Sequence, residues 1–103
     1  MKPLKGNKKI DFLFEKGVRF SSEFVRCVFL KQKTTELFYV VSVPKNSFSR
    51  AVDRNKIKRQ LREILRKNVG VFKKNGFGWY VIIYTHSSFV DFEDLNKDVC
   101  SLF

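Results

Sequence analysis

The stretch SRAVDRNKIKRQLREILRKN, residues 49–68, has the clearest periodicity in the chain, and the other elements are placed around it. Its apolar residues recur at spacings of four, three and one, which puts them on one face of an α-helix. They are Ile57, Leu61, Ile64 and Leu65. A second set recurs at spacings of four, three and four on the opposite face. This set, the basic stripe, consists of Asn55, Arg59, Arg62 and Arg66.

The basic stripe is poorly explained by helix stability alone. Like charges one turn apart repel each other by about 0.2–0.5 kcal/mol per pair. Glu63 is the acidic residue available to relieve them, and its spacing predicts an ion pair with Lys67, off the stripe. Lys58 lies on the flank of the stripe, and Arg54 lies nearer the buried edge. Because guanidinium groups grip phosphate bidentately, the pattern favours a nucleic-acid backbone as ligand.

Two other interpretations of this helix fit its residues less well. A solvated amphipathic face would carry interspersed acids, and this one does not. A membrane-surface helix would need its apolar face for lipid, but the core of the domain needs that face, and the helix contains no Trp or Phe. Phosphate binding remains the favoured interpretation.

Outward from this helix, the pattern predicts the order αβββαβα. Gly17 ends a first helix, Pro44 ends the third strand, and Gly70 ends the long helix. A hairpin loop over residues 32–35 predicts antiparallel pairing of the second and third strands. Residues 73–78 read as a turn. The predicted helices span residues 10–16, 49–68 and 91–103, and the predicted strands span residues 18–20, 24–31, 36–43 and 79–84.

The predicted fold class is α+β, a single-domain α/β sandwich with a mixed four-stranded sheet covered by helices. The strand over residues 79–84 is apolar on both faces, so it is expected at the centre of the sheet. One domain is expected over residues 1–103, with residues 1–9 as a loose basic arm.

Charge and composition restrict the partner. The chain has 21 Lys and Arg against 10 Asp and Glu, a net charge of +11, which predicts a polyanionic partner. No apolar run approaches the roughly 20 residues of a membrane-spanning helix, and the N-terminus has no signal-peptide pattern. Cys27 and Cys100 are expected to be reduced thiols, so the expected location is cytoplasmic.

No set of residues predicts catalysis or metal binding on the chain itself. His86 has no Ser or Cys at a catalytic spacing, and no phosphate-loop or zinc-protease motif occurs. Asp91, Glu93 and Asp94 are explained by the preference for acids at a helix start. The residues alone therefore indicate a nucleic-acid-binding protein with no catalytic residues and no metal site.

Two segments carry a resemblance to a known family. The segments SVPKN, residues 42–46, and RAVDRNKIKRQLRE, residues 50–63, resemble the signature of the bacterial ribonuclease P protein component. The segments LFEKG, residues 13–17, FV, residues 24–25, and GWYVII, residues 78–83, resemble other parts of that family. The resemblance covers nearly the whole chain.

The resemblance implies a sandwich with a left-handed crossover around the signature helix. It implies a monomeric protein subunit of the ribonuclease P endoribonuclease, which removes the 5′ leader of precursor tRNA. Its partners would be the ribonuclease P RNA and precursor tRNA, with no membrane involved. The RNA and Mg²⁺, bound mainly by the RNA, would perform the hydrolysis, and no organic cofactor is implied.

The resemblance and the basic stripe together give two sets of site residues. The residues expected to bind the catalytic RNA are Lys45, Arg50, Arg54, Asn55, Lys56, Lys58, Arg59, Arg62 and Arg66. The residues expected to line the leader-binding cleft are Ile10, Phe14, Cys27 and Phe29. The chain departs from the family in having Lys56 where Arg is common. At the cleft positions Ile10, Phe14 and Cys27, only Phe14 has a ring, so Phe29 or Tyr39 is expected to supply further stacking.

Two other functions fit the charge as well. A structural RNA-binding protein, such as a ribosomal component, would have the same composition, and only the signature spacing separates it from a ribonuclease P subunit. A DNA-binding module would place the Arg-rich helix in a helix-turn-helix, whereas here the helix is expected between strands.

Overall fold

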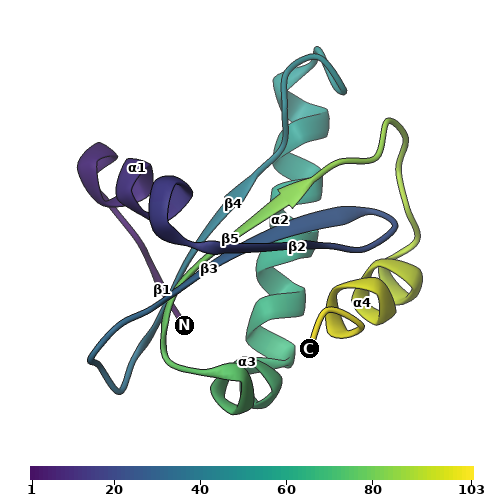
Figure 1. Ribbon diagram of the computed structural model, residues 1–103. Helices are drawn as coiled ribbons and strands as arrows, with labels where there is room; N and C mark the ends of the chain where they lie inside the picture. The colour runs from purple at the N-terminus through teal and green to yellow at the C-terminus, as the bar shows by residue number, and fades with distance from the viewer.

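The computed structural model describes residues 1–103. It shows a mixed five-stranded sheet with helices on both faces (Figure 1). The strand order in the sheet is β1-β4-β5-β3-β2. The strands are β1 (Lys2–Pro3), β2 (Val18–Ser21), β3 (Val25–Lys31), β4 (Leu37–Ser42) and β5 (Gly78–Tyr84). The helices are α1 (Asn7–Lys16), α2 (Ala51–Lys67), α3 (Val69–Asn75) and α4 (Phe92–Cys100). The α+β class is confirmed, with one strand more than predicted.

Strand β5 lies at the centre of the sheet, as its apolar sequence predicted. It pairs antiparallel with β3, where Val28 faces Val81, and parallel with β4, where Val40 faces Val81. Its first residue, Gly78, has a φ of 151°, and a Cβ there would lie 2.3 Å from the carbonyl oxygen of Leu30.

The predicted hairpin pairing of the second and third strands, β3 and β4, is wrong. They run antiparallel but β5 lies between them, because a strand with two apolar faces is buried best in the middle.

The connection from β4 to β5 has an unusual hand. In Figure 1 the chain leaves β4, passes behind the sheet as α2, and returns as β5 on the right of β4. A crossover of this geometry is left-handed, whereas nearly all parallel crossovers are right-handed. The left-handed crossover implied by the resemblance is confirmed.

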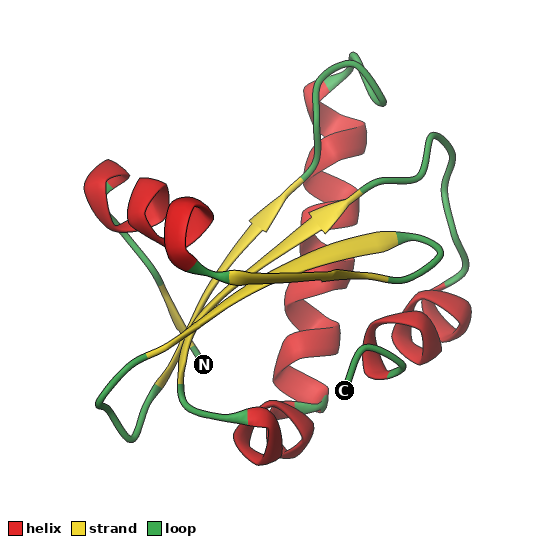
Figure 2. Cartoon of the chain, viewed as in Figure 1, coloured by secondary structure: helices red, strands yellow, loops and turns green.

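The larger core lies between the sheet and helices α2, α3 and α4 (Figure 2). The four apolar residues predicted for the long helix, Ile57, Leu61, Ile64 and Leu65, are all buried in it. The ring of Phe103 packs edge-on against Phe72 in the same core, at a centroid distance of 4.7 Å. The buried face of α2 is therefore fixed, and its opposite face must point to solvent.

A smaller core lies on the other face of the sheet, under α1. It consists of Leu4, Leu13, Val28 and Val81, with Ile10 and Phe14 partly buried against it. The two cores divide the sheet residues between its faces. Residues that belong to different cores therefore cannot line one surface.

The first residues of the chain are part of this fold, so the prediction of a loose arm over residues 1–9 is wrong. Lys2 pairs with Phe38 and Pro3 with Tyr39 in a parallel ladder. The Leu4 amide then donates to the Tyr39 carbonyl at 2.8 Å, and the Leu4 side chain is buried. Burial of Leu4 under α1 supplies the apolar contact that holds this segment on the sheet. The extra strand explains the difference between four and five strands.

The turn predicted over residues 73–78 is also corrected. Helix α3 (Val69–Asn75) occupies the first half of it, and Gly70 lies inside this helix rather than ending the long one, which stops at Lys67. The buried ring of Phe72 anchors α3 on the larger core. Beside it, the Tyr80 hydroxyl donates to the carbonyl oxygen of Gly76 at 2.6 Å.

Helix α4 is fastened to the far end of the sheet by one carboxylate. Asp98 accepts hydrogen bonds from the Ser22 hydroxyl at 2.6 Å, the Glu23 amide at 3.1 Å and the Phe24 amide at 2.9 Å. These three donors belong to the turn between β2 and β3. We call this arrangement the Asp98 clamp.

The two thiols should differ sharply in reactivity. Cys27 is fully buried, and burial raises its pKa to about 12. Burial also raises the pKa of Cys100, but this thiol is partly exposed to solvent and to reagents. Since the thiolate is the reactive form, we expect a disulfide reagent at pH 8 to modify Cys100 in the folded protein and Cys27 only on unfolding. A Cys100→Ser variant should then show no rapid phase. Rapid modification of Cys27 in that folded variant would contradict its burial.

Candidate nucleic-acid interface

The basic stripe is exposed along the side of α2 that faces away from the sheet. All four of its residues, Asn55, Arg59, Arg62 and Arg66, are solvent-exposed. Lys56 beside it is also exposed, and Lys58 on its flank is partly buried. The stripe therefore presents a row of side chains that can reach a ligand.

Two of the predicted cations are engaged within the protein. The guanidinium of Arg54 donates to the carbonyl oxygens of Phe48 at 2.7 Å and Ser49 at 2.9 Å. It thereby holds the loop before α2 against the helix. The guanidinium of Arg66 binds both carboxylate oxygens of Glu63.

The predicted Glu63–Lys67 pair is therefore replaced by Glu63–Arg66. Glu63 and Arg66 lie three residues apart, and the guanidinium fork matches the carboxylate better than an ammonium does. The hydrogen bond from Arg66 lowers the pKa of Glu63 and raises the pKa of Arg66. Lys67 instead lies over the ring of Phe92, at 5.8 Å from the centroid.

Arg59 lies between two hollows of the surface. One hollow, between α2 and α4, is lined by Lys56, Arg59, Gln60, Glu63 and Phe92. The other, between α2, β4 and the first residue of the chain, is lined by Met1, Tyr39, Arg59, Arg62, Glu63, Leu65 and Arg66. Arg59 and Arg62 form no ion pair within the protein. These two guanidiniums are the most available phosphate-binding groups on α2.

The loop before α2 extends this surface. Lys45 and Arg50 are both exposed, and Arg50 is the residue that immediately precedes the helix. The ammonium of Lys56 lies 5.0 Å from the ring centroid of Phe89, in the loop before α4. The predicted catalytic-RNA set thus lies along α2 and in the loop before it, with Arg54 as the internal support of that loop.

The predicted leader-binding residues are not brought together. Ile10 and Phe14 lie on α1, partly buried against the smaller core. Cys27 and Phe29 belong to the larger core on the opposite face of the sheet. Cys27 has no exposed surface, and Phe29 stacks on Tyr80 at 4.5 Å. Tyr39, the alternative source of stacking, also packs on the larger core, so this part of the predicted cleft is corrected.

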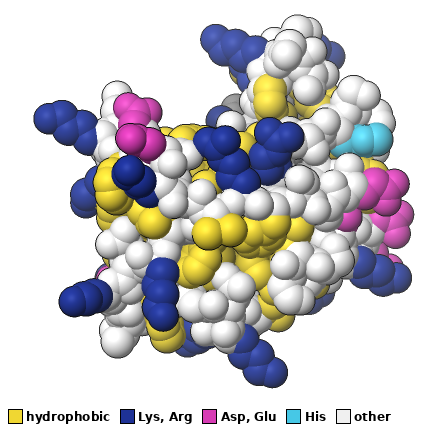
Figure 3. Space-filling view, viewed as in Figure 1, with side chains coloured by type: hydrophobic (Ala, Val, Ile, Leu, Met, Phe, Trp, Pro, Cys, Tyr) yellow, Lys and Arg dark blue, Asp and Glu magenta, His cyan; other side chains and the backbone are white.

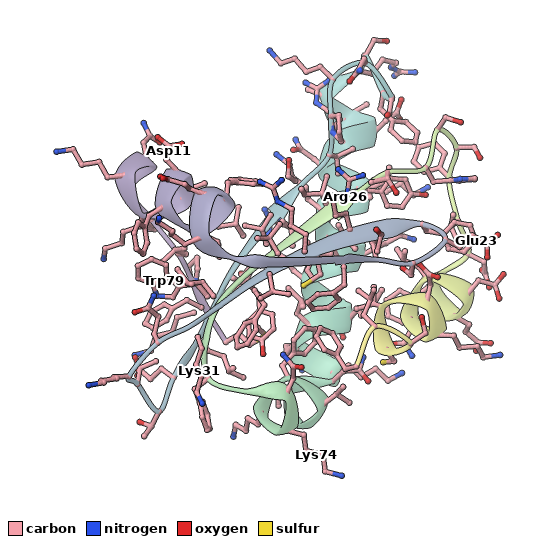
Figure 4. The ribbon with its side chains drawn as sticks, viewed as in Figure 1. Asp11, Glu23, Arg26, Lys31, Lys74 and Trp79 are labelled. Atoms are coloured by element: carbon pink, nitrogen blue, oxygen red, sulfur yellow. The ribbon has the colours of Figure 1, made fainter.

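Strand register identifies the residues that do share a face with α1. Arg26 pairs with Ile83, Leu30 with Trp79, and Trp79 with Phe38, all on the face of Val28 and Val81. Arg26 is exposed, and the apolar residues are partly exposed. Figure 4 labels Arg26 and Trp79 towards opposite ends of this face. The sequence did not predict that Arg26 and Trp79 belong to this face. Alternation along a strand separates its residues into two faces, but it does not show which face α1 covers.

This side of the molecule combines positive charge with exposed apolar surface. Figure 3 shows Lys and Arg side chains spread over the visible face, hydrophobic side chains between them, and Asp and Glu towards the margins. On the same side the Arg19 guanidinium donates to the Phe14 carbonyl at 2.6 Å and closes the end of α1. Apolar surface beside cations suits a single strand of nucleic acid, whose bases stack and whose phosphates are charged.

Other residues with chemical potential have structural roles. His86 packs edge-on against Phe24 at 5.0 Å and against Tyr84 at 6.5 Å. No group of three His, Cys, Asp or Glu side chains is arranged to hold a metal ion. No helix has the length and apolarity needed to cross a membrane. The side chains available to a ligand are therefore mainly cationic, amide and aromatic.

Comparison with known proteins gives a consistent result. The family model described as Ribonuclease P matches residues 1–103. The chain is 27% identical to the ribonuclease P protein component of Rickettsia canadensis, over 96% of this chain and 92% of that protein. It is 32% identical to the protein of the same name from Finegoldia magna, over 69% of this chain and 61% of that protein.

Solved structures agree. The ribonuclease P protein from Thermotoga maritima superposes with a TM-score of 0.86 at 26% identity, covering 99% of this chain and 94% of that chain. The Staphylococcus aureus ribonuclease P protein has a TM-score of 0.82 at 20% identity, covering 99% of this chain and 92% of that one, which supports the fold.

Proposed function

The chain belongs to the ribonuclease P protein component family, a subunit of an endoribonuclease, and from this premise we propose that it binds the catalytic RNA through α2 and the 5′ leader of precursor tRNA beside α1. The RNA with its Mg²⁺ carries out the hydrolysis. The protein raises the affinity for precursor tRNA and reduces the Mg²⁺ that the reaction needs. It acts in the cytoplasm as a monomeric subunit.

The observation that carries this proposal is the exposed pair Arg59 and Arg62 on the basic stripe. Their guanidiniums have no acidic partner in the protein and lie on the side of α2 away from the core. Two such groups one turn apart can neutralise neighbouring phosphates of a folded RNA. Because Mg²⁺ also neutralises phosphates, the protein and the ion can each reduce the repulsion between the phosphates of the folded RNA.

Leader binding is proposed for the sheet face beside α1. Arg26 supplies a cation for the phosphates, and Ile10, Phe14 and Ile83 supply apolar surface for the bases. This surface lies on the other side of the sheet from α2, so one molecule can bind the catalytic RNA and the leader at the same time.

Reconstitution tests the function directly. The purified protein should lower the Mg²⁺ concentration at which a bacterial ribonuclease P RNA cleaves precursor tRNA. Lys and Arg contacts to phosphates should also make its binding to that RNA strongly salt-dependent. A protein that binds the RNA but leaves its Mg²⁺ requirement unchanged would instead fit a structural RNA-binding protein.

Phe14 provides a test of leader binding. The change Phe14→Leu keeps an apolar side chain on the smaller core but removes the ring. We expect precursor tRNA to bind about 5- to 100-fold more weakly, with mature tRNA little affected, since one base loses a stacking partner. Phe12→Leu is the matched control, because Phe12 also lies on α1 but is 46% exposed and outside the smaller core. Equal weakening of both tRNAs would mean that Phe14 has only a packing role.

A further inference from the structure

The hollow between α2 and α4 has a composition that phosphate binding alone does not explain. It is a depression open to solvent, with a volume of about 350 Å³, and is lined by Lys56, Arg59, Gln60, Glu63 and Phe92. Phe92 is its one apolar side chain, and it is the first residue of α4. The hollow thus combines an aromatic ring with two cations, one amide and one carboxylate.

Positive charge gathers at the aromatic rings on this side of α2. Lys67 lies 5.8 Å from the centroid of Phe92, and Lys56 lies 5.0 Å from that of Phe89, in the loop three residues before Phe92. Phe89 is 47% exposed, unusually open for a phenylalanine. Each ring therefore lies within reach of an ammonium group that can also bind a phosphate.

The other polar groups of the hollow can read the edge of a base. The Gln60 side chain offers an amide donor and an acceptor. Glu63 offers acceptors, and its charge is compensated by Arg66. The acids at the start of α4, Asp91, Glu93 and Asp94, flank Phe92 in the sequence and do not line the hollow. Because they repel phosphates, the backbone of a ligand belongs on the α2 side.

We propose that this hollow holds one unpaired nucleotide of the ribonuclease P RNA. The base stacks on Phe92, Gln60 and Glu63 face its hydrogen-bonding edge, and Lys56 and Arg59 bind its phosphates. The occupant is an RNA nucleotide because Arg59 lines this hollow and the neighbouring one, so a strand bound along the stripe passes its rim. The inference rests on the proposed function and adds a base-specific contact to it.

The test combines binding with chemical footprinting of the ribonuclease P RNA. Phe92→Leu keeps an apolar side chain against the larger core and removes the ring. It should weaken RNA binding about 5- to 100-fold without changing the salt dependence, because no phosphate contact is lost. In the complex with the unaltered protein, one unpaired base should be protected from base-modifying reagents, and Phe92→Leu should restore its reactivity while the backbone protections stay.

Two further variants make the outcome decisive. Gln60→Ala leaves both rings in place and should restore reactivity at the same base, so it replaces Phe92→Leu if that variant does not fold. Phe12→Leu, on the outer side of α1, should leave affinity and footprint unchanged. If the folded Phe92→Leu and Gln60→Ala proteins give the affinity and footprint of the unaltered protein, the nucleotide site is overturned while α2 remains an RNA-binding helix. If the unaltered protein does not bind this RNA, the proposed function itself fails.

Discussion

The double change Arg59→Ala/Arg62→Ala should weaken binding to the ribonuclease P RNA by about 100-fold or more, since hydrogen bonds to charged groups contribute roughly 1.5–3 kcal/mol each. The slope of log affinity against log salt should become less steep by about 1.4–1.8, as expected for two lost phosphate contacts. Both side chains point away from the core, so the free energy of unfolding should change by only about 0.5 kcal/mol or less. Removing two like charges from one helix face also relieves their repulsion, which offsets part of this loss in the free energy of unfolding.

Cleavage should follow the same electrostatics. The double variant should support little cleavage of precursor tRNA at low Mg²⁺ and should recover substantially at high Mg²⁺, because the ion replaces the lost positive charge. Loss of a general acid, base or nucleophile could not be rescued in this way. Unchanged activity at low Mg²⁺ in a folded double variant would remove Arg59 and Arg62 from the interface. A variant that stays inactive at high Mg²⁺ would assign them a direct chemical role.

Asp98→Ala should be among the most destabilising single changes outside the apolar cores. It removes the acceptor of the Ser22 hydroxyl and of the Glu23 and Phe24 amides at once. With hydrogen bonds to a charged group at roughly 1.5–3 kcal/mol, and water replacing some of them, we expect a loss of about 3 kcal/mol. For a domain of this size that lowers Tm by about 12–24 °C in a thermal unfolding experiment.

The matched control is one turn earlier on the same helix. Asp94 is exposed in the first turn of α4, so Asp94→Ala should cost only about 0.3–1 kcal/mol through its interaction with the helix dipole. Asp98→Asn should fall between the two, because an amide keeps one acceptor oxygen. Similar losses for Asp94→Ala and Asp98→Ala would show that the Asp98 clamp contributes no more than a surface charge.

Helix α2 was predictable because its information is local. The spacing of Ile57, Leu61, Ile64 and Leu65 determines which side is buried without reference to the rest of the chain. The exposure of Arg59 and Arg62 follows from the same geometry. The predicted ion-pair partner of Glu63 was wrong because Arg66 and Lys67 both lie within reach of its carboxylate. Which of the two cations binds depends on side-chain geometry rather than on spacing along the helix.

The sheet was less predictable because strand pairing is decided at long range. Val25, Cys27 and Val28 are all buried, since helices cover both faces of β3, so alternation does not reveal the face of Cys27. Strand β1 has only two residues, one of them proline, and it is held by Leu4 reaching α1. Nothing local to either segment encodes these contacts.

The central position of β5 also bears on how the chain reaches its native state. Helices α2 and α3 separate β5 in the sequence from its two partner strands, β3 and β4. Val25 of β3, for example, pairs with Tyr84 of β5. Until β5 emerges from the ribosome, the inner edges of β3 and β4 have no partner, and such edges readily pair with other chains. Closing so long a loop is slow, so sheet formation should be a late and concerted event after synthesis. Helix formation takes about a microsecond, so α2 can form transiently before the sheet closes, and RNA phosphates bound to the basic stripe would then stabilise it by relieving the repulsion between its cations.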